Sequence, residues 1–404
     1  MSEAKTAPEY PMSRAAECPF APPPHLRELN AEKPLSRVTI WDGSTPWVVT
    51  GHAEQRSLLG DERVSVDEHR PGFPHFSEAM ANTLEHRPKM VFNLDAPEHT
   101  RLRRMLTKAF TAKRINALRP TIQQLTDDLV DQLLAGPKPV DLVEALALPL
   151  PSQMISELLG VPYSDHEFFQ RNSGIAVSRN STAEENGAAT QTLMQYLLGL
   201  VRTKLDDPGD DVLSDLAERV REEEITETEA GLLGLQVLVA GHETSANMIA
   251  LGTAALLETP EQLAVLRATE DRKVVINATE EMLRYLTVPH VGQRRIATDD
   301  IEIAGEVIRA GEGIIIDLPT ANWDPSAFPE PERLDLDRSA SHHNAFGFGP
   351  HQCVGQQLAR AELQIVYGTL FRRIPTLRLA TSFDQLEFKH AALAFGVSEL
   401  PVTW

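Results

Sequence analysis

The sequence of 404 residues has little cysteine, few aromatic residues and no long apolar run. Its two cysteines, Cys18 and Cys353, lie near opposite ends of the chain, so no disulfide framework is expected and a reducing compartment is favoured. The N-terminus lacks the basic and then apolar order of a signal peptide, and polar residues interrupt the longest apolar stretch, 230–257. The sequence therefore predicts a cytoplasmic protein without a membrane segment.

Basic residues are outnumbered: 38 Lys and Arg stand against 58 Asp and Glu, which gives a formal net charge of −20 at pH 7. This balance argues against binding to nucleic acid or to an anionic membrane. One segment reverses the pattern, because residues 100–126 contain no Asp or Glu and seven Lys or Arg. The segment is either a solvated helix face or a dock for an acidic partner or an anionic cofactor group.

The chain shows no internal repeat and no linker that would separate domains. Residues 1–35 form a Pro-rich arm, and 36–404 are expected to form one domain. Strand signals at 38–41 and 47–50 flank a turn at 42–44 and predict a hairpin. The rest of the sequence predicts a mainly α-helical fold. Strand pairs are expected within 291–316 and 376–398. Apolar residues recur every three to four positions and predict helices at 99–110, 115–135, 142–159, 165–178, 186–206, 210–222, 226–257, 260–268, 271–286 and 354–373.

Residues 346–355 read Phe-Gly-Phe-Gly-Pro-His-Gln-Cys-Val-Gly and run directly into a predicted helix. Glycines let a backbone approach a large flat ligand, and the start of a helix favours a thiolate over a thiol at Cys353. A thiolate held by backbone donors suits the axial position of haem iron and favours cleavage of an O–O bond. A buried structural cysteine is the simpler alternative, but the spacing of Gly, His and Cys is too specific for it. A zinc site is excluded because no second ligand pair follows at finger spacing.

On these residues the chain resembles the cytochrome P450 family, in particular its actinobacterial members that take electrons from a ferredoxin. The resemblance extends from Trp41 to the C-terminus. It implies the P450 fold, a helical prism with small peripheral β-sheets, around haem b. It also implies a monooxygenase that inserts one atom of O2 into its substrate. A peroxide-driven P450 and a non-catalytic haem-thiolate sensor are the alternatives, and both are disfavoured by the acid and alcohol pair described next.

Residues 240–244, Ala-Gly-His-Glu-Thr, resemble the oxygen-activation motif of that family and lie inside the long apolar segment. Polar side chains there are costly unless they bond locally or bind something. The Thr244 hydroxyl can donate to the carbonyl of Ala240 one turn earlier, which loosens the helix and opens a polar notch. The resemblance implies that Thr244 supports oxygen activation, that Glu243 relays protons, and that Ala240 and Gly241 face the cofactor.

Two further groups of residues concern the cofactor and the fold. His99 and Arg103 lie one helical turn apart and could bind a haem propionate. The resemblance adds Arg295, in preference to its neighbour Arg294, as a further cofactor ligand. It also places four residues of the cysteine loop at the cofactor: Phe346, Gly347, His351 and Gly355. Glu281 and Arg284 share one helix face, and the resemblance joins them with Arg333 in a structural clamp.

The resemblance also indicates where substrate and partner bind. A bulky apolar molecule, such as a polyketide, macrolide, terpenoid, sterol-like compound or xenobiotic, is expected, with residues 65–90 as a mobile lid. The expected pocket residues are Phe92, Leu235, Val239, Val288, Val291, Leu393 and Phe395. No flavin or nicotinamide fingerprint is present, so a 2Fe-2S or 3Fe-4S ferredoxin and an NAD(P)H-dependent reductase are expected to supply electrons to a monomer. The expected docking patch is Arg101, Arg104, Lys108, Lys113, Arg114, Arg360 and Arg372.

Overall fold

The computed structural model describes residues 7–86, 89–177, 182–390 and 392–404. The chain forms two compact units, each built from separated stretches. Unit 1 holds Met1–Ala96, Ala254–Cys353 and Phe383–Ser398, and unit 2 holds Pro97–Thr253, Val354–Ser382 and Glu399–Trp404. The predicted arm contains a helix, α1 (Pro24–Glu32), whereas a single haem domain over 36–404 stays a prediction.

Unit 1 contains a five-stranded sheet in the order β1-β2-β8-β5-β3. The strands are β1 (Leu35–Arg37), β2 (Trp47–Val49), β3 (Val64–Ser65), β5 (Gln293–Ala297) and β8 (Gly313–Ile316). Strands β2 and β8 run parallel, and the other neighbours run antiparallel. The hairpin of β6 (Ile301–Ile303) and β7 (Glu306–Ile308) confirms one predicted for this region.

The first predicted strand lies too late in the sequence. Residues 38–41 were expected to pair, but β1 ends at Arg37 and pairs Leu35 with Val49. Pro46 explains part of the difference, because its carbonyl accepts from the Val38 amide (3.1 Å) but its nitrogen has no hydrogen to return the bond. Regular pairing therefore stops where the proline begins.

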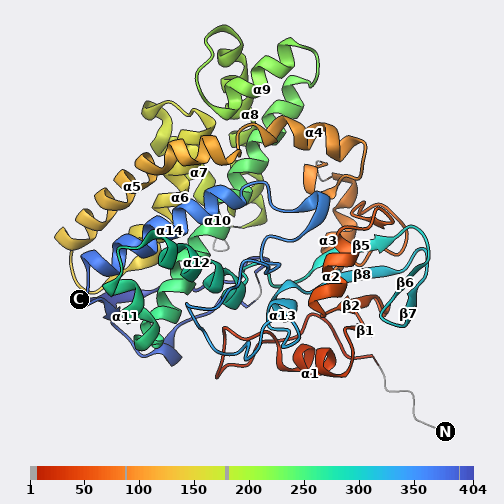
Figure 1. Cartoon of the computed structure of the whole chain (residues 1–404). Coiled ribbons are helices and arrows are strands. Elements are labelled where there is room, and N and C mark those ends of the chain that lie inside the picture. The colour runs from red at the N-terminus through yellow and green to blue at the C-terminus, as the bar shows by residue number, and fades with distance from the viewer. Residues whose placement is uncertain (1–6, 87–88, 178–181, 391) are drawn as a thin grey trace. The chain divides into compact units, whose positions relative to one another are not determined.

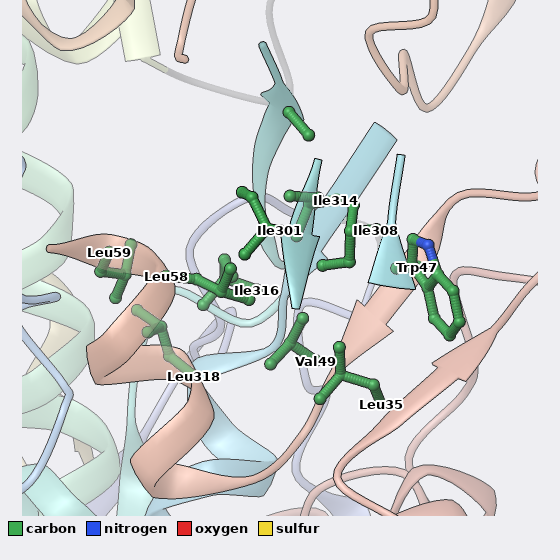
Figure 2. Packing of buried hydrophobic residues seen from close by; sticks show 11 residues of the cluster. Leu35, Trp47, Val49, Leu58, Leu59, Ile301, Ile308, Ile314, Ile316 and Leu318 are labelled. Carbon is green, nitrogen blue, oxygen red and sulfur yellow. The ribbon is translucent and has the colours of Figure 1, made fainter. Parts of the chain in front are cut away.

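Branched residues of this sheet form the core of unit 1 together with two short helices, α2 (His52–Leu59) and α13 (Leu318–Asn322) (Figure 2). Leu58, Leu59 and Leu318 of these helices pack against Ile314 and Ile316 of β8. Unit 1 also contains α3 (Glu78–Asn82), α11 (Pro260–Ala268) and α12 (Arg272–Leu286). The last two confirm predicted helices, and α12 carries the Glu281 and Arg284 side chains.

Unit 2 is helical, with one small sheet of β4 (Val140–Asp141), β10 (Pro401–Thr403) and β9 (Arg378–Leu379). Its helices are α4 (Glu98–Thr107), α5 (Ala112–Ala135), α6 (Pro149–Leu159), α7 (His166–Val177), α8 (Ala183–Asp206), α9 (Val212–Arg221), α10 (Glu227–Glu258) and α14 (Gln356–Arg373). Helix α14 lies alongside α5 (Figure 1), and α10 continues past residue 253 into unit 1. Within the described ranges, no helix is both long and apolar enough to cross a bilayer.

One predicted helix is interrupted. Residues 142–159 form a wide turn of π geometry at Val143–Ala147 and then α6. The Leu148 amide bonds five residues back to Val143 (2.9 Å), and Pro149, which follows, has no amide hydrogen to continue the ladder.

Candidate active site

The cysteine loop of unit 1 has a backbone shape that favours glycine at two positions. Gly347 and Gly349 have positive φ angles of 68° and 71°. A Cβ added to Gly349 would lie 2.2 Å from the Leu59 carbonyl oxygen, so the loop passes in contact with the end of α2. The Cys353 amide donates to the Phe346 carbonyl (2.9 Å), and the Cys353 side chain is exposed. The loop therefore presents the thiol at its end, three residues before α14 begins.

Buried polar residues hold the start of this loop. The Ala345 amide donates to Nδ1 of His343 (3.1 Å), and the Asn344 amide donates to the side-chain oxygen of Asn322 (2.7 Å). The His343 ring lies 5.9 Å from the half-buried Phe346 ring. His351 ends the short turn Gly349–His351 and is also half-buried. These hydrogen bonds fix the position of the backbone that leads to Phe346 and the Cys353 thiol.

Arg295 is a buried cation that bonds only neutral acceptors. Its guanidinium donates to the Arg294 carbonyl (2.7 Å) and to the Gln293 side-chain oxygen (2.9 Å). In the part of the chain that the structure describes, no carboxylate lies within ion-pair distance of it. Burial lowers its pKa to about 10. Arg294 instead pairs with Glu68 (2.8 Å), so the preference for Arg295 as the binder of a carboxylate has structural support.

Helix α10 of unit 2 is mostly buried but exposes one stripe at its middle. Val239 is 42% exposed, and Ala240 and Thr244 are exposed as well. The Thr244 hydroxyl donates to the Ala240 carbonyl (2.7 Å), which confirms the predicted local bond. Gly241 faces another helix, since a Cβ there would lie 2.5 Å from Cδ1 of Ile155. Glu243 is half-buried beside the stripe.

Sequence reasoning missed an ionisable residue next to this stripe. Glu362 of α14 is buried and hydrogen-bonds Ser245, the residue after Thr244. Burial raises the pKa of Glu362 to about 7. Its position inside the apolar stretch 358–371 is the signal that could have found it.

The predicted propionate pair lies on α4. His99 is buried and Arg103 is half-buried, one turn apart on the same helix. The two side chains therefore share one face, as the spacing predicts.

The clamp is present, but its third member differs from the prediction. Glu281 and Arg284 form a fully buried ion pair (2.7 Å). Arg338, not Arg333, completes it, with its Nε 3.1 Å from the Glu281 carboxylate. The prediction for Arg333 was wrong, because that side chain is 59% exposed and pairs with Glu330 and Asp335. Only the Arg333 carbonyl reaches the clamp, where Arg284 donates to it (3.4 Å).

The predicted pocket residues differ in exposure. Phe92 and Leu393 of unit 1 and Val239 of unit 2 are large exposed apolar side chains. Val291 is half-buried, whereas Leu235 and Val288 are buried. Phe395 is wholly buried, stacked on Phe388 with the Arg14 guanidinium 4.1 Å from its ring centre. Phe395 is therefore a core residue, and its assignment to the pocket wall was wrong.

The basic patch is smaller than its sequence suggests. Arg101 pairs with Glu98 (2.5 Å) and with Glu229. Asp215 binds both Lys108 (2.6 Å) and Arg114 (2.5 Å). Arg360 donates to Gln356, while Arg104, Lys113 and Arg372 are exposed and have no ion pair with any described residue.

These features suit haem. Unit 1 offers an exposed thiol on a glycine loop, as an iron ligand requires, and a buried cation, Arg295, that has no ion pair with any described carboxylate. Unit 2 offers small and apolar side chains with one hydroxyl on a helix, as a flat apolar ring with bound oxygen requires. The donor set therefore fits a thiolate-ligated porphyrin with anionic propionates.

Known proteins point the same way. The cytochrome P450 family model matches residues 23–207 and 177–375. The chain is 58% identical over 398 residues to cytochrome P450 CYP105Q4 of Mycobacterium marinum, covering 98% of this chain and 96% of that protein. It is 58% identical over 403 residues to cytochrome P450 GfsF of Streptomyces halstedii, covering 99% and 97% of the two chains.

Solved structures agree with the sequences. The crystal structure of GfsF has a TM-score of 0.94 and covers 98% of this chain and 100% of its own. Mycinamicin VIII C21 methyl hydroxylase MycCI of Micromonospora griseorubida, bound to mycinamicin VIII, is 42% identical. Its TM-score is 0.89, with 98% of this chain and 100% of that chain covered.

Proposed function

The chain belongs to the cytochrome P450 family, within its actinobacterial CYP105 group, and from that premise we propose which residues of this haem monooxygenase bind the cofactor, the substrate and the redox partner. The mainly helical fold and haem b with O2 as co-substrate follow from the same membership. A non-catalytic sensor is thereby excluded. When bound, the haem activates O2 so that one oxygen atom enters the substrate.

Cys353 is proposed as the axial iron ligand. The single observation that carries this proposal is its exposed thiol at the end of a glycine loop whose shape is set by hydrogen bonds. Arg295 is proposed to bind a propionate, because a carboxylate would neutralise its buried charge. The other residues proposed to contact the cofactor are His99, Arg103, Ala240, Phe346, Gly347, His351 and Gly355. Gly241 is proposed to contact it through its backbone alone, because its Cβ direction points to Ile155.

Thr244 and Glu243 are proposed to deliver the protons that oxygen activation needs. The Thr244 hydroxyl is exposed, and its one bond, to the Ala240 carbonyl, can be exchanged for a bond to water or to a ligand at low cost. The half-buried Glu243, next in sequence to Thr244, is proposed from the family resemblance to relay protons, through water and not by direct contact with that hydroxyl.

Replacing Thr244 with alanine is expected to uncouple electron use from oxygenation. Without the hydroxyl, product formed per NADPH should fall by about 100-fold, the lower end of the range that positioned proton donors contribute. Hydrogen peroxide should rise by the matching amount. Thr244→Ser retains the hydroxyl and serves as the control, with coupling close to that of the wild type. Equal coupling in the alanine and wild-type proteins would contradict the assignment.

The substrate is proposed to be a bulky apolar molecule of the macrolide, polyketide, terpenoid or sterol-like type. The exposed apolar side chains of Phe92, Val239 and Leu393 support this, because they offer dispersion contacts and no charge. The 42% identical relative bound to mycinamicin VIII supports it independently. Reconstituted enzyme should bind such compounds with a shift of its ferric spin state, and a panel in which only small polar compounds shift the spectrum would refute the class.

Electrons are proposed to come from an acidic ferredoxin with an NAD(P)H-dependent reductase, in the cytoplasm. The exposed cations Arg104, Lys113 and Arg372, which have no ion pair with described residues, support a docking surface on unit 2. Turnover with NADPH, a surrogate ferredoxin and its reductase tests this source. Hydrogen peroxide alone is the comparison. If it supports turnover at the same rate as NADPH, reductase and ferredoxin together, the result would favour the peroxide-driven alternative.

Charge reversal on this surface should slow reduction. Arg104→Glu and Lys113→Glu are each expected to lower the rate of haem reduction by ferredoxin about threefold to tenfold at low ionic strength, and the difference should vanish as salt screens the charges. Stopped-flow reduction at several salt concentrations measures it. Arg378→Glu is the control, since that exposed residue of β9 lies outside the basic segment and changes the net charge equally. Equal slowing by the control would show a net-charge effect only.

A further inference from the structure

The N-terminal arm is packed into unit 1 through Tyr10. Its side chain is 5% exposed, and its hydroxyl donates to the Val291 carbonyl (2.8 Å) and lies 3.4 Å from the Asp317 carboxylate. The approach is close, since a Cβ on Gly292 would lie 2.7 Å from the Tyr10 oxygen. Gly292 also has a positive φ of 81°, so this backbone turn is shaped for glycine and for the tyrosine beside it.

The same tyrosine contacts the base of the predicted lid. Its ring lies 5.6 Å from that of Phe76. Phe76 and Phe73 in turn flank the Arg294 guanidinium at 5.4 and 5.3 Å, and Arg294 pairs with Glu68 of the same segment. Residues 68–76 are thereby fixed to β5, so Tyr10 contacts the fixed end of the segment predicted to act as a lid.

A second arm residue, Arg14, supports the neighbouring wall. Its buried guanidinium donates to the carbonyls of Phe20 and Ala21 (both 2.9 Å) and lies against the Phe395 ring. The Phe395 amide donates to the Val288 carbonyl (2.8 Å), and Pro289 bridges to Ala394. Val288 and Val291, both predicted to line the pocket, therefore lie in a segment, 288–292, that bonds to residues 394–395, and the arm packs against the core residue Phe395.

Burying a phenol and a guanidinium is costly unless their polar atoms form hydrogen bonds. The Tyr10 hydroxyl has its bond, whereas Arg14 bonds through Nη1, and its Nε and Nη2 have no partner among the described residues. Burial raises the pKa of Tyr10 well above its usual value and lowers that of Arg14 to about 10. Tyr10 therefore stays a neutral donor at all physiological pH values, and its bond to Val291 is a fixed feature.

We propose that the arm, residues 7–21, helps to select the substrate, with Tyr10 as a positioning residue that sets where Val291 and the base of the lid stand. The proposal rests on the proposed function, because it takes 288–292 and the lid as walls of the substrate pocket. Tyr10 contacts no substrate itself in this scheme. Tyr10 acts by fixing the position of residues 288–292 and of the base of the lid, which are proposed to contact the substrate.

The test uses two haem ligands of different size on the holoprotein. Imidazole needs little space, whereas clotrimazole must contact the pocket walls. Absorbance titrations should show that Tyr10→Phe, which keeps the ring and loses the hydroxyl, changes the Kd of clotrimazole by about fivefold, the effect of one lost hydrogen bond. The Kd of imidazole should stay within about twofold. Phe76→Leu, which removes the ring neighbour of Tyr10, should shift the ratio of the two Kd values as well.

Thr39→Val is the matched control. It removes one side-chain bond to the arm, from Thr39 to the Ala7 carbonyl (3.0 Å), and retains the Thr39 carbonyl that accepts from the Tyr10 amide (2.8 Å), so the Tyr10 hydroxyl keeps its bond to Val291. Its ratio of Kd values should equal that of the wild type. The proposal is overturned if Tyr10→Phe leaves the ratio unchanged or if Thr39→Val shifts it equally. Failure of the wild-type protein to bind imidazole at all would instead refute the haem assignment.

Discussion

Cys353→Ala is expected to abolish oxygenation while leaving the polypeptide folded. The thiol is exposed, and substitutions at exposed positions usually change stability by only about 0.5 kcal/mol, so the change is expected to remove chemistry far more than stability. Without a thiolate, the electron donation that favours O–O cleavage is gone. Product should fall to background, and the reduced protein treated with CO should lose the long-wavelength absorption band of a thiolate-ligated haem.

Two further variants define this result. Cys353→His supplies a nitrogen ligand, so haem should bind but show the shorter-wavelength CO band and no product. Cys18→Ala removes the half-buried thiol of the arm and should keep the full band and activity. Native oxygenation by Cys353→Ala would contradict the ligand assignment, as would loss of the band in Cys18→Ala alone.

Long helices could be predicted closely from sequence. The helix expected at 226–257 is α10 at Glu227–Glu258, and that expected at 354–373 is α14 at Gln356–Arg373. Both have many turns, so apolar periodicity accumulates over the window. The helices α13 and α1 were not predicted: α13 has only five residues, too few for a periodic pattern, and α1 lies inside the Pro-rich arm.

Local chemistry could also be predicted, but the choice of distant partners could not. The bond from Thr244 to Ala240 spans one helical turn, so the sequence determines it. The pairing of Lys108 and Arg114 with Asp215 depends on how α9 packs near α4 and α5, which no local pattern records. The same holds for Phe395, whose apolar character fits a pocket wall and a core equally until Arg14 and Phe388 are seen around it.

The second large effect is expected on the free energy of unfolding, from a variant of the clamp formed by Glu281, Arg284 and Arg338. Glu281→Gln is expected to destabilise the protein by about 3–5 kcal/mol, the usual cost of removing one partner from a buried ion pair. Glu281 accepts from Arg284 (2.7 and 2.8 Å), from Arg338 (3.1 Å) and from the Asp335 amide (3.1 Å). Its loss leaves two largely buried guanidiniums without a carboxylate. Denaturant unfolding of the holoprotein measures the change, and haem should be released at lower denaturant than in the wild type.

A pair of arginine variants tests which residue completes the clamp. The Arg338 side chain is 12% exposed and also donates to the Glu330 and Arg333 carbonyls (2.9 and 3.2 Å), so Arg338→Gln should cost several kcal/mol by unpairing part of Glu281. Arg333→Gln is the matched control, because its exposed surface ion pairs contribute only about 0–1 kcal/mol. An equal cost for the two variants would mean that the Arg333 side chain, and not only its carbonyl, supports the buried carboxylate.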